Sequence, residues 1–228
     1  MNIFAPTALL TILNPRGLRK KPTGLSAALL LVIAAALFLP NCNRYTPEQE
    51  ALAAEILRQR AEKDRDFKND PNSPLLAEDR EAFQGLNYYP VDLSLRFEGP
   101  IVKYDSLLPD TIIGTKGDRR PALRYGYFPF TYQGREYRLQ IYKILRDNPE
   151  YAKYLFLGFT DRTGGGETYG GGRYIDLTEN AENHYVVDFN LAYNPFCAYN
   201  PRYSCAIPAA ENRLPFAVNA GEKIFKKH

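Results

Sequence analysis

The chain has 228 residues, of which 45% are hydrophobic and 24% charged, which suits one globular domain with short additions. Four of the 29 Lys and Arg and none of the 26 Asp and Glu lie in residues 1–41, so the rest of the chain is nearly neutral despite a formal net charge of +3. Because no cluster of Lys and Arg follows residue 41, the sequence argues against a nucleic-acid-binding surface.

The first 41 residues have the pattern of an export signal. Basic residues at positions 16–21 precede an apolar run at positions 25–39. A basic stretch before a short apolar run is typical of a secretory signal, whereas a membrane-spanning helix needs about 20 apolar residues. The charge keeps the amino end in the cytoplasm and sends the remainder across the membrane. We therefore expect the protein in the cell envelope, facing the periplasm or the exterior.

The apolar run ends in Leu39-Pro40-Asn41-Cys42, which resembles a bacterial lipoprotein signal with Leu three places before a lipidated Cys. Pro40 and Asn41 depart from the small residues that usually precede such a Cys. Lipidation of Cys42, with the membrane as the partner, is the first expectation. The alternatives are an uncleaved N-terminal anchor, cleavage near Ala34–Ala36, and a buried helix of the fold.

A helix is expected from Thr46, after a short tether, within residues 42–70. Thr46 can cap it, Pro47 suits its first turn, and Gln49 completes a capping box. One apolar stripe is expected along it, formed by Leu52, Ala53, Ile56, Leu57 and Ala61. Such a helix packs on its own domain or serves as a membrane spacer or a partner-binding helix, and ordinary packing is the simpler interpretation.

Residues 71–226 are expected to form a β-rich domain after a short helical turn at 78–83. Alternation is clearest in Glu136–Tyr142, which pairs with Leu123–Tyr132 across the two-residue turn Gln133-Gly134. Further strands are expected at 93–104, 154–160, 173–177, 185–190 and 214–218. These elements predict a mainly β (α+β) fold, either a small antiparallel barrel or a two-layer sandwich, with an N-terminal amphipathic helix.

Three stretches have unusual residue combinations: positions 63–80, the string GETYGGGRY at Gly166–Tyr174, and positions 188–223, which include AYNP, CAY, YSC and ENRL. In them the chain resembles, from Thr46 to about Phe225, the domain-of-unknown-function 1684 family (DUF1684), as a bacterial lipoprotein-like member. The resemblance implies a common fold. It implies no activity, cofactor or catalytic residue, because that family has none assigned.

The glycine-rich segment at positions 163–172 invites comparison with phosphate-binding loops. It lacks the Lys-Ser/Thr of a P-loop and the spacing of a dinucleotide-binding loop. Its backbone N–H groups could still hold an anion, with Arg162 or Arg173 as the counter-ion. The alternative is a loop that needs positive φ angles or close backbone approach.

Cys197 and Cys205 are separated by seven residues and are expected to form a disulfide in an oxidising compartment, which would stabilise the fold by roughly 2–3 kcal/mol. Two free structural thiols, or a Cys nucleophile, are the alternatives. A nucleophile needs a base, and His184 and His228 are the only imidazoles. With two His, no metal site is expected.

Three carboxylates are candidates for acid–base chemistry, namely Glu167, Asp188 and Glu211, each beside aromatic residues or Asn. The alternative is that Asp188 and Glu211 brace the irregular segment at 194–212 by accepting hydrogen bonds. Of the three carboxylates, Glu167 and Asp188 are retained as weak catalytic candidates.

The first functional hypothesis is a small-ligand-binding module with a pocket between the glycine-rich loop and the Tyr193–Asn212 loop. The expected ligand contacts are Glu167, Tyr169, Arg173, Asn190 and Arg202. Among these, Glu167 and Arg173 are expected to face solvent beside the glycines. The rival hypotheses are a carboxylate-dependent hydrolase and a structural envelope protein without a ligand. The ligand and any cofactor remain unknown at this stage.

Overall fold

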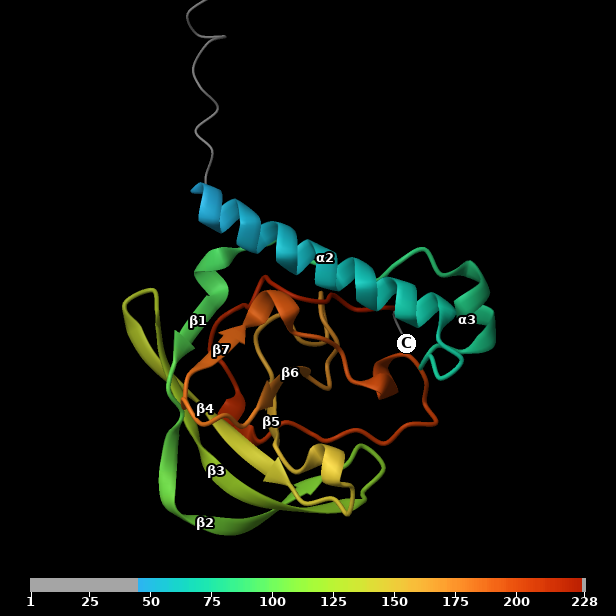
Figure 1. The fold of residues 1–228 in the computed structure, drawn as a ribbon. Coiled ribbons are helices and arrows are strands. Elements are labelled where there is room, and N and C mark those ends of the chain that lie inside the picture. The colour runs from blue at the N-terminus through green and yellow to red at the C-terminus, as the bar shows by residue number, and fades with distance from the viewer. Residues whose placement is uncertain (1–44, 227–228) are drawn as a thin grey trace, which may run out of the picture. The chain divides into compact units, whose positions relative to one another are not determined.

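The computed structural model describes residues 45–226, so the predicted signal segment and Cys42 lie outside the described residues. The chain from Tyr45 forms helix α2 (Pro47–Asn69) and the short helix α3 (Ala77–Ala82), followed by seven strands. Figure 1 shows α2 lying across one end of the β-structure. Within this described part, no helix is both long and apolar enough to cross a membrane.

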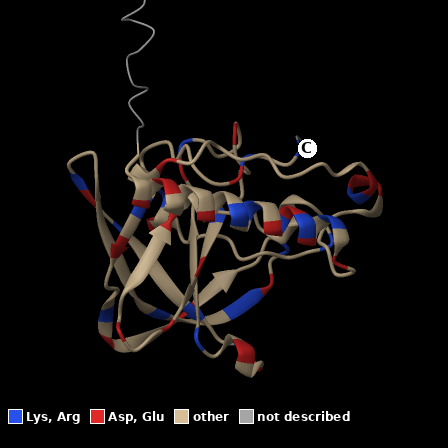
Figure 2. Cartoon of the chain, turned by 45° about the horizontal axis from the view of Figure 1, so that its top comes forward, with Lys and Arg blue, Asp and Glu red and all other residues tan. Residues whose placement is uncertain are grey.

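Helix α2 begins as the capping residues predict. The Thr46 hydroxyl accepts a hydrogen bond from the Gln49 backbone N–H at 3.3 Å, and the Gln49 side chain accepts one from the Thr46 N–H at 3.0 Å. The predicted stripe is partly wrong, because Leu57 is 55% exposed. The buried positions are Ile56, Arg60 and Phe67, which recur at helical spacing on one face. Figure 2 shows basic and acidic residues interspersed along α2.

Arg60 fixes α2 to the β-domain. Its guanidinium donates hydrogen bonds to the backbone oxygens of Tyr89, at 2.8 Å, and of Asn190, at 2.8 and 3.2 Å. The side chain is only 7% exposed. The helix therefore packs on its own chain through a buried polar contact as well as through Ile56 and Phe67.

The strands form two antiparallel sheets. Strand β1 (Arg96–Gly99) pairs with β7 (Tyr185–Asp188). The second sheet has the order β2-β3-β4-β5-β6, and its strands are β2 (Val102–Ile113), β3 (Arg119–Tyr132), β4 (Arg135–Ile144), β5 (Tyr154–Phe159) and β6 (Arg173–Thr178). The predicted mainly β fold with an N-terminal helix is confirmed. Of the two architectures left open, the strands between residues 45 and 226 form separate sheets, as in a sandwich.

The predicted hairpin joins β3 and β4. Tyr132 pairs with Arg135, and the two turn residues Gln133 and Gly134 have φ angles of 49° and 73°. Positive φ at both positions is the requirement of the type I′ turn, whose twist matches that of the flanking strands. This local signal therefore sets the register of β3 and β4, the pair of strands with the most paired residues.

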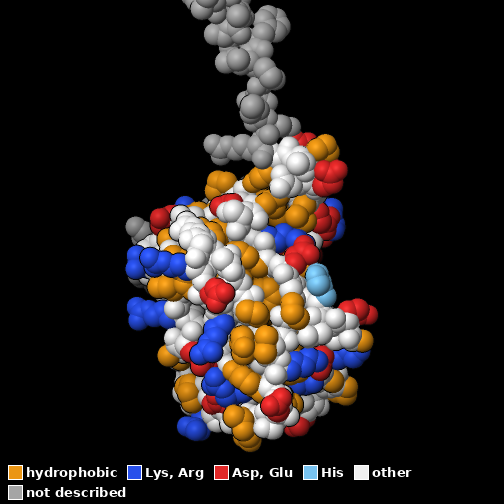
Figure 3. Space-filling view, turned by 90° about the vertical axis from the view of Figure 1, so that its left-hand side faces the viewer, with side chains coloured by type: hydrophobic (Ala, Val, Ile, Leu, Met, Phe, Trp, Pro, Cys, Tyr) orange, Lys and Arg blue, Asp and Glu red, His pale blue; other side chains and the backbone are white. Residues whose placement is uncertain are grey.

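Strand β2 is an edge of the larger sheet and exposes Val102, Leu107, Leu108 and Ile113. Its pairing with β3 shifts between Lys103 and Leu108, which marks a bulge. Bulges and charged residues on an edge limit pairing with other chains. Figure 3 shows the left-hand side of Figure 1, where hydrophobic side chains gather near the centre with Lys and Arg beside them.

Side-chain alternation divides the larger sheet into two covered faces. On β5, Leu155, Leu157 and Phe159 face the main core, which also contains Phe189 and residues of β3, β4, β6 and β7. Phe156 lies on the opposite face in a second cluster. Both faces of β5 are therefore buried. The outer face is covered by the chain after β6, which we call the covering chain.

A side chain from this covering chain fills a gap between β4 and β5. The two strands pair only at Tyr142 and Phe156. Beside that point the Asn212 amide accepts from the Gln140 N–H at 2.7 Å and donates to the carbonyls of Gln140 and Gly158, at 2.9 and 2.8 Å. Asn212 thus replaces missing backbone hydrogen bonds of the sheet.

The predicted strand at 214–218 is absent from the structure. In this segment Leu214 N–H donates to Thr160 O at 2.8 Å, beside an isolated bridge between Thr160 and Arg213. Leu214 and Val218 are nevertheless buried in the main core. The hydrophobic pattern therefore identifies core residues correctly. The segment forms no strand, however, because its backbone is held by isolated contacts and side chains.

Candidate functional site

Arg173 is not at the surface, so the expectation that it faces solvent is wrong. Its side chain is 0% exposed, and the guanidinium pairs with Asp161 Oδ2 at 2.8 Å. It also donates to the carbonyls of Val218 at 2.9 Å, Glu222 at 3.2 Å, and Ala220. These contacts use the guanidinium to hold residues 218–222 against β6.

Asp188 and Asn190 are also buried, at 3% and 0% exposure. Asp188 Oδ1 accepts from the N–H and the side-chain amide of Asn190, both at 2.8 Å. The same amide pairs with the backbone of Asp92 through two bonds of 2.8 Å. Burial raises the pKa of Asp188, and the hydrogen bonds from Asn190 lower it by less, so the pKa is raised overall. Asp188 thus holds Asn190 in place, and the bracing of residues 194–212 by Asp188 stays a prediction.

Glu167 and Tyr169 lie near the surface of the glycine-rich loop. The Glu167 carboxylate is 61% exposed, accepts from Tyr89 Oη at 3.0 Å, and lies 3.5 Å from Lys223 Nζ. Tyr169 lines a hollow of about 420 Å³ between the glycine-rich loop and residues 208–213. A cavity therefore exists close to the predicted place, but Glu167, Arg173, Asn190 and Arg202 do not line it.

Cys197 and Cys205 are adjacent and unbonded in the structure. The Cys197 N–H donates to Cys205 Sγ at 3.1 Å, and Tyr169 Oη lies 3.7 Å from Cys197 Sγ. The hydrogen bond from the Cys205 thiol, helped by Tyr169 and Thr115, lowers the pKa of Cys197 to about 6. The same interaction, followed by burial, raises the pKa of Cys205. The disulfide stays a prediction.

Arg202 is exposed and does not reach the other predicted site residues. Its guanidinium lies over the Tyr203 ring, 4.7 Å from the centroid, and donates to Tyr203 Oη at 2.6 Å. The backbone oxygen of Arg202 accepts from Lys116 Nζ at 2.9 Å. Its contacts are therefore local.

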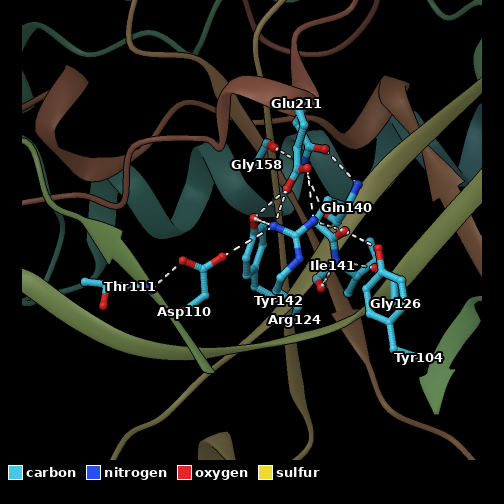
Figure 4. A network of polar contacts seen from close by, with 11 residues as sticks. Tyr104, Asp110, Thr111, Arg124, Gly126, Gln140, Ile141, Tyr142, Gly158 and Glu211 are labelled. Carbon is cyan, nitrogen blue, oxygen red and sulfur yellow. Dashed lines mark hydrogen bonds and ion pairs between the residues drawn. The ribbon is translucent and has the colours of Figure 1, made fainter. Parts of the chain in front are cut away.

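Glu211 belongs to a polar network on the outer face of the sheet, shown in Figure 4. Its carboxylate accepts from Tyr142 Oη at 2.7 Å and from Arg124 at 2.9 and 3.0 Å. Arg124 also donates to Gln140 Oε1 at 2.9 Å, and Asp110 lies 3.4 Å away. Although partial burial opposes it, the bonds from Arg124 and Tyr142 lower the pKa of Glu211. The network holds residues 210–212 on the sheet, next to the hydrogen bonds that Asn212 makes with Gln140 and Gly158.

A second cavity, which we call the aromatic cleft, lies over the outer face of β4–β6 and has a volume of about 320 Å³. Its floor comes from strand alternation. Tyr154 and Phe156 alternate with core residues on β5, as Tyr174 and Asp176 do on β6, and Phe156 pairs with Asp176 in the register. The Phe156 and Tyr174 rings meet edge to face at 4.9 Å.

The remaining walls of the aromatic cleft come from two other segments. Tyr151, in the turn before β5, packs edge to face on Tyr154 at 6.0 Å. The covering chain contributes Phe196 and Tyr203, whose ring centroids lie 5.3 Å apart. It also contributes Tyr193, whose ring centroid lies 5.8 Å from that of Tyr174. Rings from four separate parts of the chain thus enclose one cavity.

Asp176 is the one carboxylate lining the cleft in the described structure. Its Oδ1 accepts from Tyr193 Oη at 2.7 Å and from Tyr154 Oη at 2.9 Å. Burial, followed by the Asp176 charge, raises the pKa of both tyrosines, so both hydroxyls stay protonated and donate. Two donors on one oxygen fix the carboxylate in a single orientation.

Sequence reasoning found only part of this cleft, the segment from Tyr193 onward. It missed Tyr151, Tyr154, Phe156, Tyr174 and Asp176. The signal was present in β5, because aromatic residues alternate there with aliphatic ones and both faces of the strand are apolar.

A model of the family described as "Protein of unknown function (DUF1684)" matches residues 81–223. The chain belongs to this family. The DUF1684 match spans every described strand and all residues named above in the aromatic cleft, whereas the whole of α2 precedes it. The predicted family is therefore confirmed over residues 81–223, whereas the lipoprotein-like character stays a prediction.

A solved structure has a similar fold. It is the solution NMR structure of an uncharacterized protein of Haloarcula marismortui, with 32% sequence identity and a TM-score of 0.61. The similarity covers 79% of the present chain and 98% of that protein. No curated protein matches. The DUF1684 relationship thus gives a fold and leaves the activity to be argued from the site.

Proposed function

We propose that this DUF1684 protein is a binding module that takes a small molecule into the aromatic cleft. The observation that carries the proposal is a cleft of about 320 Å³ that is lined by rings from four parts of the chain and by one carboxylate, Asp176, held by two tyrosine hydroxyls. Small-molecule sites are typically concave, mostly apolar and supplied with a few placed polar groups.

The other hollows fit this description less well. The hollow at 127–138, about 530 Å³, is lined by a single hairpin. The hollow beside the glycine-rich loop, about 420 Å³, has one aromatic wall, Tyr169. The hairpin surface gives a ligand fewer sides to contact than the aromatic cleft does, and the hollow beside the glycine-rich loop offers fewer aromatic walls.

The test is a thermal-shift screen of metabolites against the wild type, followed by calorimetry on a pair of variants. Phe196→Ala removes a cleft wall that is 44% exposed, so the fold should persist. Ile207→Ala, at a 48% exposed position of the same segment outside the cleft, is the matched control. We expect at least about tenfold weaker binding for Phe196→Ala and no change for Ile207→Ala. Equal affinities for both variants would exclude the cleft.

We also propose that the module is exported and anchored to a membrane through lipidated Cys42. The basic segment, the short apolar run and Leu39 three places before Cys42 support this proposal. Fractionation of native cells should place the protein with membranes, and Cys42→Ala should abolish labelling by a lipid precursor. Unchanged labelling of Cys42→Ala, or native protein in the cytoplasm with its amino end intact, would contradict it.

A further inference from the structure

The aromatic cleft carries an uncompensated positive charge at one end. Arg146, in the loop after β4, lies over the Tyr151 ring, 4.5 Å from its centroid. Within residues 45–226 no Asp or Glu forms an ion pair with Arg146. The other cation of the cleft, Arg120, is occupied, because it pairs with Asp118 at 2.8 Å and donates to Ser204 O at 2.7 Å.

The opposite end of the same row of side chains is a hydrogen-bond acceptor. Arg146 lies on Tyr151, Tyr151 packs on Tyr154, and the Tyr154 hydroxyl donates to Asp176. Two aromatic rings therefore separate the guanidinium from the carboxylate. A ligand that satisfies both must carry an anionic group and a hydrogen-bond donor at opposite ends of a planar body.

The volume and the walls limit that body. A cavity of about 320 Å³ holds the volume of about ten water molecules. Aromatic walls favour a flat ring, through offset or edge-to-face contacts. A guanidinium on a ring face is a preferred partner for a carboxylate, because its N–H groups match the two oxygens.

We propose that the ligand is a small aromatic carboxylate with a hydroxyl or amino group at the far end, whose carboxylate is bound by Arg146 and whose donor is bound by Asp176. This proposal rests on the binding function assigned above to the aromatic cleft. The same argument disfavours a ligand with a cationic group at the Arg146 end, where it would meet like charge.

The test uses three probes and calorimetry on the purified full-length protein. The probes are 4-hydroxycinnamate, its neutral amide, and cinnamate without the hydroxyl. We expect 4-hydroxycinnamate to bind at least tenfold more tightly than the amide and several-fold more tightly than cinnamate. Arg146→Gln should abolish the preference for the acid over the amide. Arg146→Lys should retain part of it, and Arg119→Gln, an exposed arginine outside the cleft, should leave it unchanged.

The outcomes separate this inference from the binding function. If the amide binds as tightly as the acid, or if Arg146→Gln keeps the preference, the ligand class is wrong while the cleft remains a binding site. If other molecules bind and depend on Phe196 but none of the three probes does, the ligand class is again wrong. If no screened molecule binds in a Phe196-dependent way, both proposals fail.

Discussion

Replacing Arg173 by Ala should strongly destabilise the domain. The Arg173–Asp161 pair is 0% and 3% exposed, and removing one partner of a buried ion pair costs about 3–5 kcal/mol. Three backbone carbonyls, of Val218, Ala220 and Glu222, also lose their donor. Each unmade hydrogen bond costs about 1 kcal/mol, which water entering the new cavity partly offsets. We expect a loss of at least about 4 kcal/mol, which is a large part of the roughly 5–15 kcal/mol that stabilises an ordinary domain.

The measurement is equilibrium unfolding in urea, followed by circular dichroism. Arg173→Lys keeps the charge beside Asp161 but cannot donate to all three carbonyls, so an intermediate loss of about 2 kcal/mol is expected. Arg162→Ala, at an exposed position nearby, and Glu167→Ala should each stay within about 0.5 kcal/mol of the wild type. A loss below about 1 kcal/mol for Arg173→Ala would refute the bracing argument.

Three further predictions follow from the covering chain. An unreduced digest of exported protein, analysed by mass spectrometry, should contain a Cys197–Cys205 disulfide, and two alkylatable thiols in freshly extracted protein would exclude it. After reduction, the iodoacetamide rate at Cys197 should fall as pH drops through about 6, because the thiolate is the reactive form and the Cys205 thiol lowers this pKa; Cys205→Ala should move the midpoint upward, and a midpoint near pH 8.5 in the parent protein would contradict the assignment. Asn212→Ala leaves three buried backbone groups without a partner and should cost about 2–4 kcal/mol in urea unfolding, whereas an effect near zero would show that the gap between β4 and β5 closes without it.

Local signals in the sequence predicted the elements that depend on neighbouring residues. The Thr46 capping box starts α2, and Gln133-Gly134 closes the β3–β4 hairpin with two positive φ angles. These features need only residues that are close in the chain. The prediction was poorer where distant residues decide, as at Leu57, which is exposed because Arg60 takes the buried face of the helix.

Arg173 shows why the predicted site was partly misplaced. The glycines before it suggested an exposed loop, but Arg173 is the first residue of β6 and shares the core side of the strand with Ile175 and Leu177. The alternation of residues along β6 could have placed Arg173 in the core, but only if a buried carboxylate had been assumed as its ion-pair partner. Asp161 was not identifiable as that partner, because their pairing depends on the path of the glycine-rich loop between them.

The attachment of the last part of the chain has a consequence for the order of assembly. Asn212 completes the sheet between β4 and β5, and the carbonyls of Val218, Ala220 and Glu222 accept hydrogen bonds from the buried Arg173. A polypeptide that emerges amino end first, from a ribosome or an export channel, therefore leaves an open seam and an uncovered arginine until these residues arrive. Because the domain needs these contacts for its full stability, it cannot complete its fold before residues 212–222 are present. The chain can therefore pass through a channel until its synthesis or translocation is almost complete.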